Sequence, residues 1–255
     1  HNPKEYNGFK IVINNSSFKE EDIQNLKFKI EQSDFKIGSG KLLKESFNES
    51  YIKEISKKIE IKKKLKIVLD CGNGSGGVIG PKILRKYSSE LIELFCEVDG
   101  NFPNHHPDPS EPKNLFNLIE TVKIEGADLG IALDGDGDRL GVVDSEGEII
   151  FPDRYLALMA EDTLKKNKSG KIVFDVKCSN KLDQVIREND GVPIMTKTGH
   201  SFIKSEIART DAVLGGEMSG HIFYNDNWYG FDDAIFASLR LIAVSYTHLT
   251  LPTKA

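Results

Sequence analysis

The sequence predicts an α/β protein with two successive domains of similar size. Short apolar runs alternate with amphipathic helical segments between residues 65 and 151, and a second alternation follows between residues 152 and 244. Alternation of this kind is typical of sheets whose strands are joined by helices. The length of 255 residues is sufficient for two domains of ordinary size.

The region before residue 65 carries weaker signals. Residues 9–13 predict a short buried strand, and residues 20–32 predict a helix with isoleucine and leucine side chains on one face. Residues 33–48 contain glycine and serine without a strong hydrophobic period, which predicts a linker. Isoleucines spaced three and four apart predict another helix at 51–59.

The first alternation predicts strands, helices and a hairpin. The glycine-rich turn Gly72–Gly77 follows its first strand, and a turn at Glu146-Gly147 closes the hairpin. The expected strands are residues 65–70, 91–96, 128–133, 140–144 and 148–151, and the expected helices are residues 79–87 and 112–125.

The second alternation repeats this order. Pro152 and Asp153 are typical of the first turn of a helix. The expected strands are residues 171–176, 192–195 and 212–215, and the expected helices are residues 152–166, 181–188, 202–209 and 232–244. In such sheets the loops after the strands bind the ligands. Functional residues are therefore expected in the loops that follow these strands.

Composition restricts the partners. A net charge of −5 gives no support for nucleic-acid binding, and the longest apolar runs are too short to cross a bilayer. The three cysteines lack the spacing of a zinc site or a disulfide framework, which fits a reducing cytoplasm. We expect a cytoplasmic protein that binds neither nucleic acid nor membrane.

The strongest candidate site is the acidic loop after strand 128–133. It reads Asp134-Gly135-Asp136-Gly137-Asp138-Arg139. Like charges about 4 Å apart repel by roughly 4 kcal/mol at an effective dielectric near 20, so the loop needs a cation. Oxygen ligands favour Mg²⁺, with Ca²⁺ or Mn²⁺ as alternatives. An EF-hand is excluded because its glycine and glutamate positions hold Arg139 and Ser145.

Polar residues follow other expected strands. Lys177 is placed where its cation could meet a phosphate or sugar oxygen, and His200 is either a ligand or a helix cap. Glu217, Ser219 and His221 alternate in one loop, which suits a polyol because a carboxylate can accept from two hydroxyls.

Two further motifs are ambiguous. Gly72–Gly77 formally matches a dinucleotide fingerprint, but Asp70 places a carboxylate near the pyrophosphate position, so a tight turn is favoured. The proline-rich loop at 102–109 contains two adjacent histidines, His105 and His106. It is either a rigid structural loop or part of a site.

Together, five ordered motifs resemble the α-D-phosphohexomutase superfamily, most closely its bacterial phosphomannomutase/phosphoglucomutase branch. The resemblance covers about residues 1–244, and Val98–Pro109 also shares it. The motifs are His1-Asn2-Pro3 with Asn7-Gly8-Phe9-Lys10, Asp134–Arg139, Asp175–Cys178, Lys197–His200 and Gly216–His221.

The resemblance implies four domains around a central cleft, of which this chain holds two three-layer α/β domains with mixed sheets. Residues 1–48 would be the end of domain 1 and a linker, 49–150 the metal-binding domain 2, and 151–244 the sugar-binding domain 3. Residues 245–255 are expected to be a non-native tail. Both ends are expected to be cut, without the phosphoserine before His1 and without domain 4. We therefore expect this chain alone to be inactive.

The implied activity is the Mg²⁺-dependent interconversion of hexose 1-phosphate and hexose 6-phosphate through a phosphoserine and a hexose 1,6-bisphosphate, by a monomer. The substrates would be glucose and mannose phosphates, since glucosamine mutases usually carry glutamine where Met218 stands. One departure from the family pattern is Ala234, which stands where glycine is usual. The alternatives are a phosphoglucosamine mutase, a non-catalytic sugar-phosphate or metal-binding module, and a dinucleotide-dependent oxidoreductase.

The resemblance also implies a role for each site residue. His1 and Lys10 would lie near the phosphoserine, and Arg139 would contact phosphoryl oxygens. Mg²⁺ would be held by Asp134, Asp136 and Asp138, and the substrate by Lys177, His200, Glu217, Ser219 and His221.

Overall fold

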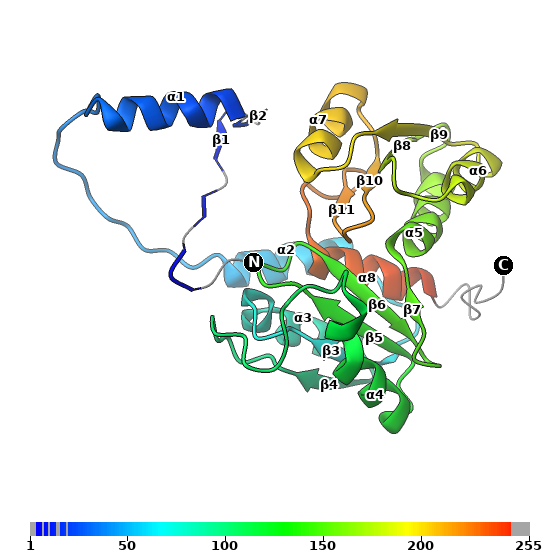
Figure 1. The fold of residues 1–255 in the computed structure, drawn as a ribbon. Helices are drawn as coiled ribbons and strands as arrows, with labels where there is room; N and C mark the ends of the chain where they lie inside the picture. Colours follow the sequence, from blue (N-terminus) through cyan, green and yellow to red (C-terminus); the bar gives the residue numbers. More distant parts are fainter. Residues whose placement is uncertain (1–3, 7, 10, 14–15, 19, 246–255) are drawn as a thin grey trace.

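Two α/β domains with mixed sheets make up the body of the protein (Figure 1). The computed structural model describes residues 4–6, 8–9, 11–13, 16–18 and 20–245. The fold class predicted from the alternation of strands and helices is confirmed.

The first domain contains a five-stranded sheet in the order β4-β3-β5-β6-β7. Strands β3, β4 and β5 are parallel, and β6 and β7 are antiparallel additions. The short acidic loop between β5 and β6 leaves no room for a crossover helix, so the two strands must pair antiparallel. The strands are β3 (Lys66–Asp70), β4 (Glu90–Leu94), β5 (Leu129–Leu133), β6 (Leu140–Asp144) and β7 (Ile149–Ile150).

Side-chain alternation along β3 separates two layers of core in this domain. Val68 packs in a cluster with residues of α4 (Phe116–Glu125) and of the preceding 3-10 turn η2 (Pro112–Leu115). Ile67 and Leu69 lie in another cluster with residues of α2 (Asn48–Lys58) and α3 (Gly80–Tyr87). The sheet is thus buried on both faces, as expected for parallel strands.

The second domain contains a four-stranded sheet in the order β11-β10-β8-β9. Its strands are β8 (Lys171–Asp175), β9 (Val192–Thr196), β10 (Leu214–Gly216) and β11 (Ile222–Tyr224), of which only β11 is antiparallel to its neighbour. Helix α7 (His200–Thr210) shares one apolar cluster with this sheet. Helices α5 (Pro152–Lys166) and α6 (Asn180–Glu188) contribute to the cluster on its other face.

Helix α8 (Ala234–Ser245) joins the two domains (Figure 1). It packs on β5, β6 and α3 of the first domain and on β11 and α5 of the second. Its side chains are apolar and buried on nearly every side, which suits a helix between two layers. The core layers on one face of each sheet therefore merge into one cluster. In the part of the chain that the structure describes, no helix is long and apolar enough to cross a membrane.

The N-terminal region differs most from the prediction. The prediction of a buried strand at 9–13 was wrong, because Phe9 is 85% exposed. Among the residues described in this region, β1 (Val12–Ile13) forms a short antiparallel pair with β2 (Ser16–Ser17). Helix α1 (Glu20–Glu31) forms where expected but stands apart from the two domains (Figure 1). The apolar face that the spacing predicted is exposed to solvent.

Smaller differences lie near the second sheet and at element ends. Strand β11, which is three residues long, was not predicted. The helices predicted to begin at 202 and 232 begin at His200 and Ala234. The predicted helix at 112–125 begins as the 3-10 turn η2.

Arg240 is a buried cation on the apolar helix α8. Its Nη1 donates to Asp226 Oδ1 at 3.1 Å, and its Nη2 lies 3.5 Å from Asp162 Oδ2. The guanidinium also lies over the Tyr224 ring, 4.1 Å from the centroid. Because these three groups come from different elements, Arg240 ties α8 to the second domain.

Replacing Arg240 with methionine should destabilise the protein strongly. The change leaves Asp226, which is 5% exposed, as an unpaired buried charge, and such losses cost about 3–5 kcal/mol. Urea unfolding followed by circular dichroism measures the change. The control is Arg209→Met, which removes the exposed pair with Glu206 and should change little. Equal losses in both variants would contradict the structural role of Arg240.

Candidate functional site

Asp134 organises the acidic loop. The side chain is fully buried, and its Oδ1 accepts from the backbone N–H groups of Gly137, Asp138 and Arg139, each at 3.0 Å. Its Oδ2 accepts from Arg139 Nε at 2.7 Å. Both carboxylate oxygens of Asp134 therefore have hydrogen-bond donors from the loop itself. The loop conformation is therefore set by Asp134 through contacts within the protein.

The glycine-rich turn at 72–77 packs against the backbone of this loop. The Ser75 N–H donates to the Gly135 carbonyl oxygen at 2.9 Å. A Cβ atom at Gly74 would lie 2.7 Å from the same oxygen, which is too close for any other residue. This packing accounts for the glycine at the turn without a bound dinucleotide.

The proline-rich loop at 102–109 holds Arg139 in place. Asp108 Oδ1 accepts from Arg139 Nη1 at 2.9 Å and from the Ser110 hydroxyl at 2.7 Å. Burial opposes ionisation of Asp108, but the bonds from Ser110 and the charge of Arg139 lower its pKa below the ordinary value. The sequence prediction missed Asp108, although the loop itself had been recognised as unusual.

The two adjacent histidines of this loop point to different surroundings. His105 Nε2 lies 3.0 Å from Oδ2 of the buried Asp70, while His106 is exposed. The hydrogen bond from His105 to Asp70 raises the pKa of His105 above its ordinary value. His105 therefore has a structural contact, and the pair does not converge on one ligand.

The loop after β10 brings three predicted side chains together. His221 Nδ1 lies 2.8 Å from both Glu217 Oε1 and Ser219 Oγ, and the Ser219 hydroxyl also donates to Glu217 Oε1. The other carboxylate oxygen, Oε2, accepts from the Gly199 N–H at 3.1 Å. Burial would raise the pKa of Glu217, but the bonds from His221 and Ser219 lower it.

The acidic loop and the Glu217 loop meet at the boundary of the two domains. The Leu140 N–H donates to the Gly220 carbonyl oxygen at 3.0 Å, and Arg139 forms a backbone bridge with His221. His221 Nε2 lies 3.2 Å from Asp138 Oδ1. Burial would lower the pKa of His221, but hydrogen bonds to Asp138 and Glu217 raise it to about 9. At neutral pH an imidazolium therefore links the two loops.

The remaining predicted residues are less tightly connected. His200 stacks on His221, with ring centroids 5.8 Å apart, and its Nδ1 lies 3.7 Å from Asp232 Oδ2. Lys177 is exposed in the turn after β8, at the same sheet edge as Glu217 because β8 and β10 are parallel neighbours. His1, Lys10 and the tail residues after 245 lie outside the described residues.

The acidic loop fits a hard divalent cation. Asp134, Asp136 and Asp138 each offer a carboxylate oxygen, and these atoms lie within 4.8 Å of one another. Three carboxylates without nitrogen or sulfur donors match the preference of Mg²⁺. The donor chemistry of these residues is therefore compatible with the predicted cofactor.

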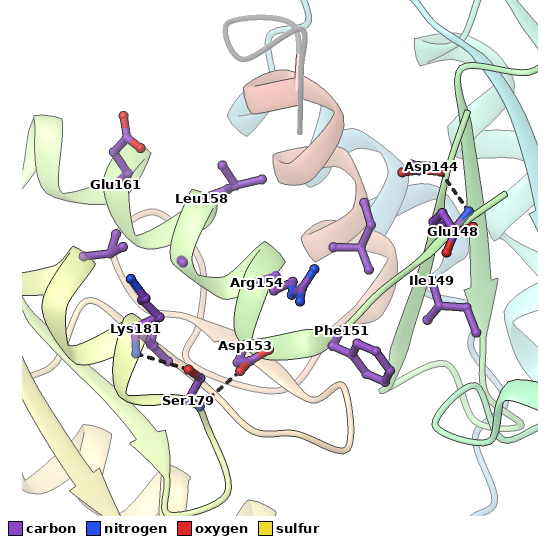
Figure 2. Close-up of a pocket in the computed structure, with 14 residues that line it drawn as sticks. Asp144, Glu148, Ile149, Phe151, Asp153, Arg154, Leu158, Glu161, Ser179 and Lys181 are labelled. Carbon is purple, nitrogen blue, oxygen red and sulfur yellow. Dashed lines mark hydrogen bonds between the residues drawn. The ribbon is translucent and has the colours of Figure 1, made fainter. Parts of the chain in front are cut away.

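A large cavity lies away from these residues. It has a volume of about 610 Å³ and is bounded by α5, α6 and the β7 region (Figure 2). Phe151 and Leu158 contribute apolar surface, and Arg154 and Lys181 contribute charge. None of the predicted site residues lines it. The candidate site is thus defined by converging polar groups and not by this cavity.

Comparisons with known proteins agree with the resemblance seen in the sequence. The family model for phosphoglucomutase/phosphomannomutase alpha/beta/alpha domain II matches residues 49–147, and the model for domain III matches residues 151–252. The chain belongs to the phosphoglucomutase/phosphomannomutase family. The family resemblance predicted from the five motifs is therefore confirmed.

Relatives in this family are similar over nearly the whole chain. A phosphomannomutase/phosphoglucomutase of Pseudomonas putida is 49% identical over 244 residues, which cover 96% of this chain and 53% of the relative. A phosphoglucomutase of Neisseria meningitidis serogroup A is 46% identical over 246 residues, covering 96% of this chain and 54% of the relative.

A solved structure of a phosphoglucomutase/phosphomannomutase family protein from Burkholderia thailandensis has a TM-score of 0.92 and 45% identity. The match covers 96% of this chain and 53% of that one. The chain therefore spans about half the length of the curated relatives it matches.

Replacing Gly220 with alanine should disrupt the junction between the two loops. Gly220 has φ +97°, and an added Cβ would lie 2.7 Å from the Leu140 carbonyl oxygen. Backbone strain of roughly 1–3 kcal/mol would add to a clash of similar size. Denaturant unfolding measures the loss of stability.

The matched control for this change is Gly126→Ala. Gly126 also has positive φ, but nothing lies within 4 Å of an added Cβ. The left-handed conformation alone should cost alanine roughly 1–2 kcal/mol there. If Gly220→Ala is no more destabilising than Gly126→Ala, the close approach at the junction is not as described.

The bond between His105 and Asp70 should make stability depend on pH. Because the folded-state pKa of His105 is raised, its stabilisation is complete below about 6.5 and is lost as pH rises through the folded value. His105→Gln should therefore lose more unfolding free energy at pH 6 than at pH 9, roughly 1–3 kcal/mol at the lower pH. A loss independent of pH would exclude the charged contact.

Proposed function

We propose that these two domains belong to a phosphohexomutase that interconverts the 1-phosphate and 6-phosphate of glucose and mannose. The main observation is the junction at His221, where a carboxylate loop suited to a cation meets a loop suited to sugar hydroxyls. Phosphoryl transfer depends mainly on positioning the substrate and on neutralising the phosphoryl oxygens. The loop suited to sugar hydroxyls would position the substrate, and the cation of the carboxylate loop would neutralise the oxygens. The names of the relatives support the same activity.

On this proposal the first domain supplies the positive charge. Asp134, Asp136 and Asp138 would hold Mg²⁺, which supplies Lewis-acid stabilisation of phosphoryl oxygens when bound. Arg139 has Nε and Nη1 engaged by Asp134 and Asp108, and no described residue accepts from its Nη2. The guanidinium is therefore fixed in orientation, and Nη2 is available to donate to a phosphoryl oxygen.

The second domain would bind the sugar. Glu217 and Ser219 would hydrogen-bond two neighbouring hydroxyls, O3 and O4, and His221 would hold the carboxylate in place. Contacts at O3 and O4 do not distinguish glucose from mannose, because these sugars differ at C2. Lys177 and His200 would add contacts at the same edge of the sheet.

The remaining assignments follow from the family. We propose that residues 1–48 close a preceding domain, that 49–150 form the metal-binding domain and that 151–244 form the sugar-binding domain. His1 and Lys10 would lie beside a phosphoserine, which exchanges its phosphoryl group with the sugar through a hexose 1,6-bisphosphate. Since the chain spans about half of its relatives, we expect it to have little activity without the other domains.

The activity is tested with a protein in which this chain is joined to its flanking domains. It should convert glucose 1-phosphate to glucose 6-phosphate with Mg²⁺, and a chelator should abolish turnover. Asp136→Asn should lower kcat by about 10²–10³-fold, because one charge that holds the cation is removed. Glu146→Gln, at the exposed hairpin turn, is the control and should leave kcat unchanged.

Two outcomes would overturn this proposal. The first is a folded full-length protein with no turnover of glucose, mannose or glucosamine phosphates, which would favour a non-catalytic binding module. Turnover of glucosamine phosphates alone would instead identify a phosphoglucosamine mutase and would exclude the sugar assignment.

A further inference from the structure

We propose a second cation site, formed by Asp138, His221 and Asp232, that binds a late first-row divalent metal such as Zn²⁺. The site lies beside the acidic loop and combines two carboxylates with an imidazole. It goes beyond the proposed mutase activity, because the Mg²⁺ ion of that activity requires only the oxygen ligands of the acidic loop.

The distances among the three ligand atoms suit a small metal ion. His221 Nε2 lies 3.2 Å from Asp138 Oδ1 and 3.8 Å from Asp232 Oδ2, and all three atoms lie within 4.8 Å of one another. Ligands bound to Zn²⁺ at 2.0–2.1 Å in a tetrahedron are about 3.3 Å apart. The two distances from His221 Nε2 lie within about 0.5 Å of this value, so a small movement of these side chains toward a common centre would complete the site.

Asp232 provides independent evidence for a ligand at this point. Its side chain is only 9% exposed, and no described residue donates a hydrogen bond to its buried Oδ2. Leaving a buried carboxylate oxygen without a donor is costly. The nearest imidazole nitrogens, those of His200 and His221, lie 3.7 and 3.8 Å away, which is too far for a hydrogen bond. A cation between Asp232 and His221 would satisfy this oxygen.

The surroundings orient His221 as a metal ligand. Its Nδ1 is held at 2.8 Å by Glu217 Oε1, so the ring presents Nε2 toward Asp138 and Asp232. A carboxylate behind a metal-bound histidine is a common arrangement, because it fixes the ring and strengthens the nitrogen as a ligand. His200 Nδ1 is also buried without a hydrogen-bond partner among the described residues, and it lies 3.7 Å from Asp232 Oδ2, where it could provide a fourth ligand.

The donor set separates the two cation sites. Imidazole nitrogen favours Zn²⁺, Co²⁺ or Ni²⁺, whereas the oxygen ligands of the acidic loop favour Mg²⁺. Because Asp138 belongs to both sets, the two cations would compete. Occupation of the mixed site would draw Asp138 and His221 away from the roles proposed for them in sugar-phosphate chemistry.

Titration of the 255-residue protein with Co²⁺ tests this inference directly. Visible absorbance of Co²⁺ is strong in four- or five-coordinate sites with nitrogen ligands and weak in six-coordinate oxygen sites. One saturable, intense transition is expected, and Zn²⁺ should abolish it by displacement. Asp232→Asn and His221→Ala should each weaken Co²⁺ binding by about 10-fold or more, and Glu217→Gln should weaken it by about 10–100-fold.

The matched control is Asp136→Asn, which removes a ligand of the acidic loop only and should leave the intense Co²⁺ transition unchanged. Thermal unfolding of each variant checks its fold, and the near-isosteric Asp232→Asn decides the result if His221→Ala does not fold. Intense absorbance that survives in Asp232→Asn but disappears in Asp136→Asn would overturn the inference, as would its absence from the unmodified protein. Because no turnover is measured, this failure is distinct from failure of the mutase proposal.

Discussion

The contact between the acidic loop and the Glu217 loop is the constraint on which the candidate site depends. Each loop leaves a strand of a different domain, and the backbone bond from Leu140 to Gly220 holds them together. Only a glycine permits this approach, because Gly220 combines positive φ with van der Waals contact to a carbonyl group. Helix α8 packs against both sheets and so connects the two domains that carry these loops.

Most charged side chains at the junction are paired with other groups of the protein. Asp134 is satisfied by backbone N–H groups and by Arg139, and Arg139 is in turn held by Asp108. His221 lies between Asp138 and Glu217, with its pKa raised to about 9 because two carboxylates favour the imidazolium. Asp232 is the exception, since its buried oxygen has no donor among the described residues. Both oxygens of Asp134 therefore have hydrogen-bond donors, whereas Oδ2 of Asp232 has none among the described residues.

Much of the fold and of the candidate site was predictable, because short stretches of sequence carry the patterns that indicate them. Hydrophobic period identified most helices and strands, and strand ends indicated where Asp134 and Glu217 would lie. The exposure of Phe9 was not predictable, since its side chain is apolar but is 85% exposed in the structure. Asp108 and Asp232 were also missed. Asp108 matters because it binds Arg139, which is distant in the sequence, and Asp232 matters because its Oδ2 has no donor among the described residues. A local sequence pattern reveals neither property.

The amino-acid sequence by itself determined the α/β class, the order of most elements, the family and the group of carboxylates at 134–138. These properties depend on residue types and short spacings, which a linear chain already contains. The tertiary structure alone decided that His221 reaches Asp138, that Asp108 holds Arg139 and that Asp232 is left without a donor. The first of these contacts depends on the docking of one domain against the other through α8. The other two depend on loops that are distant in the sequence and are brought together by packing within each domain.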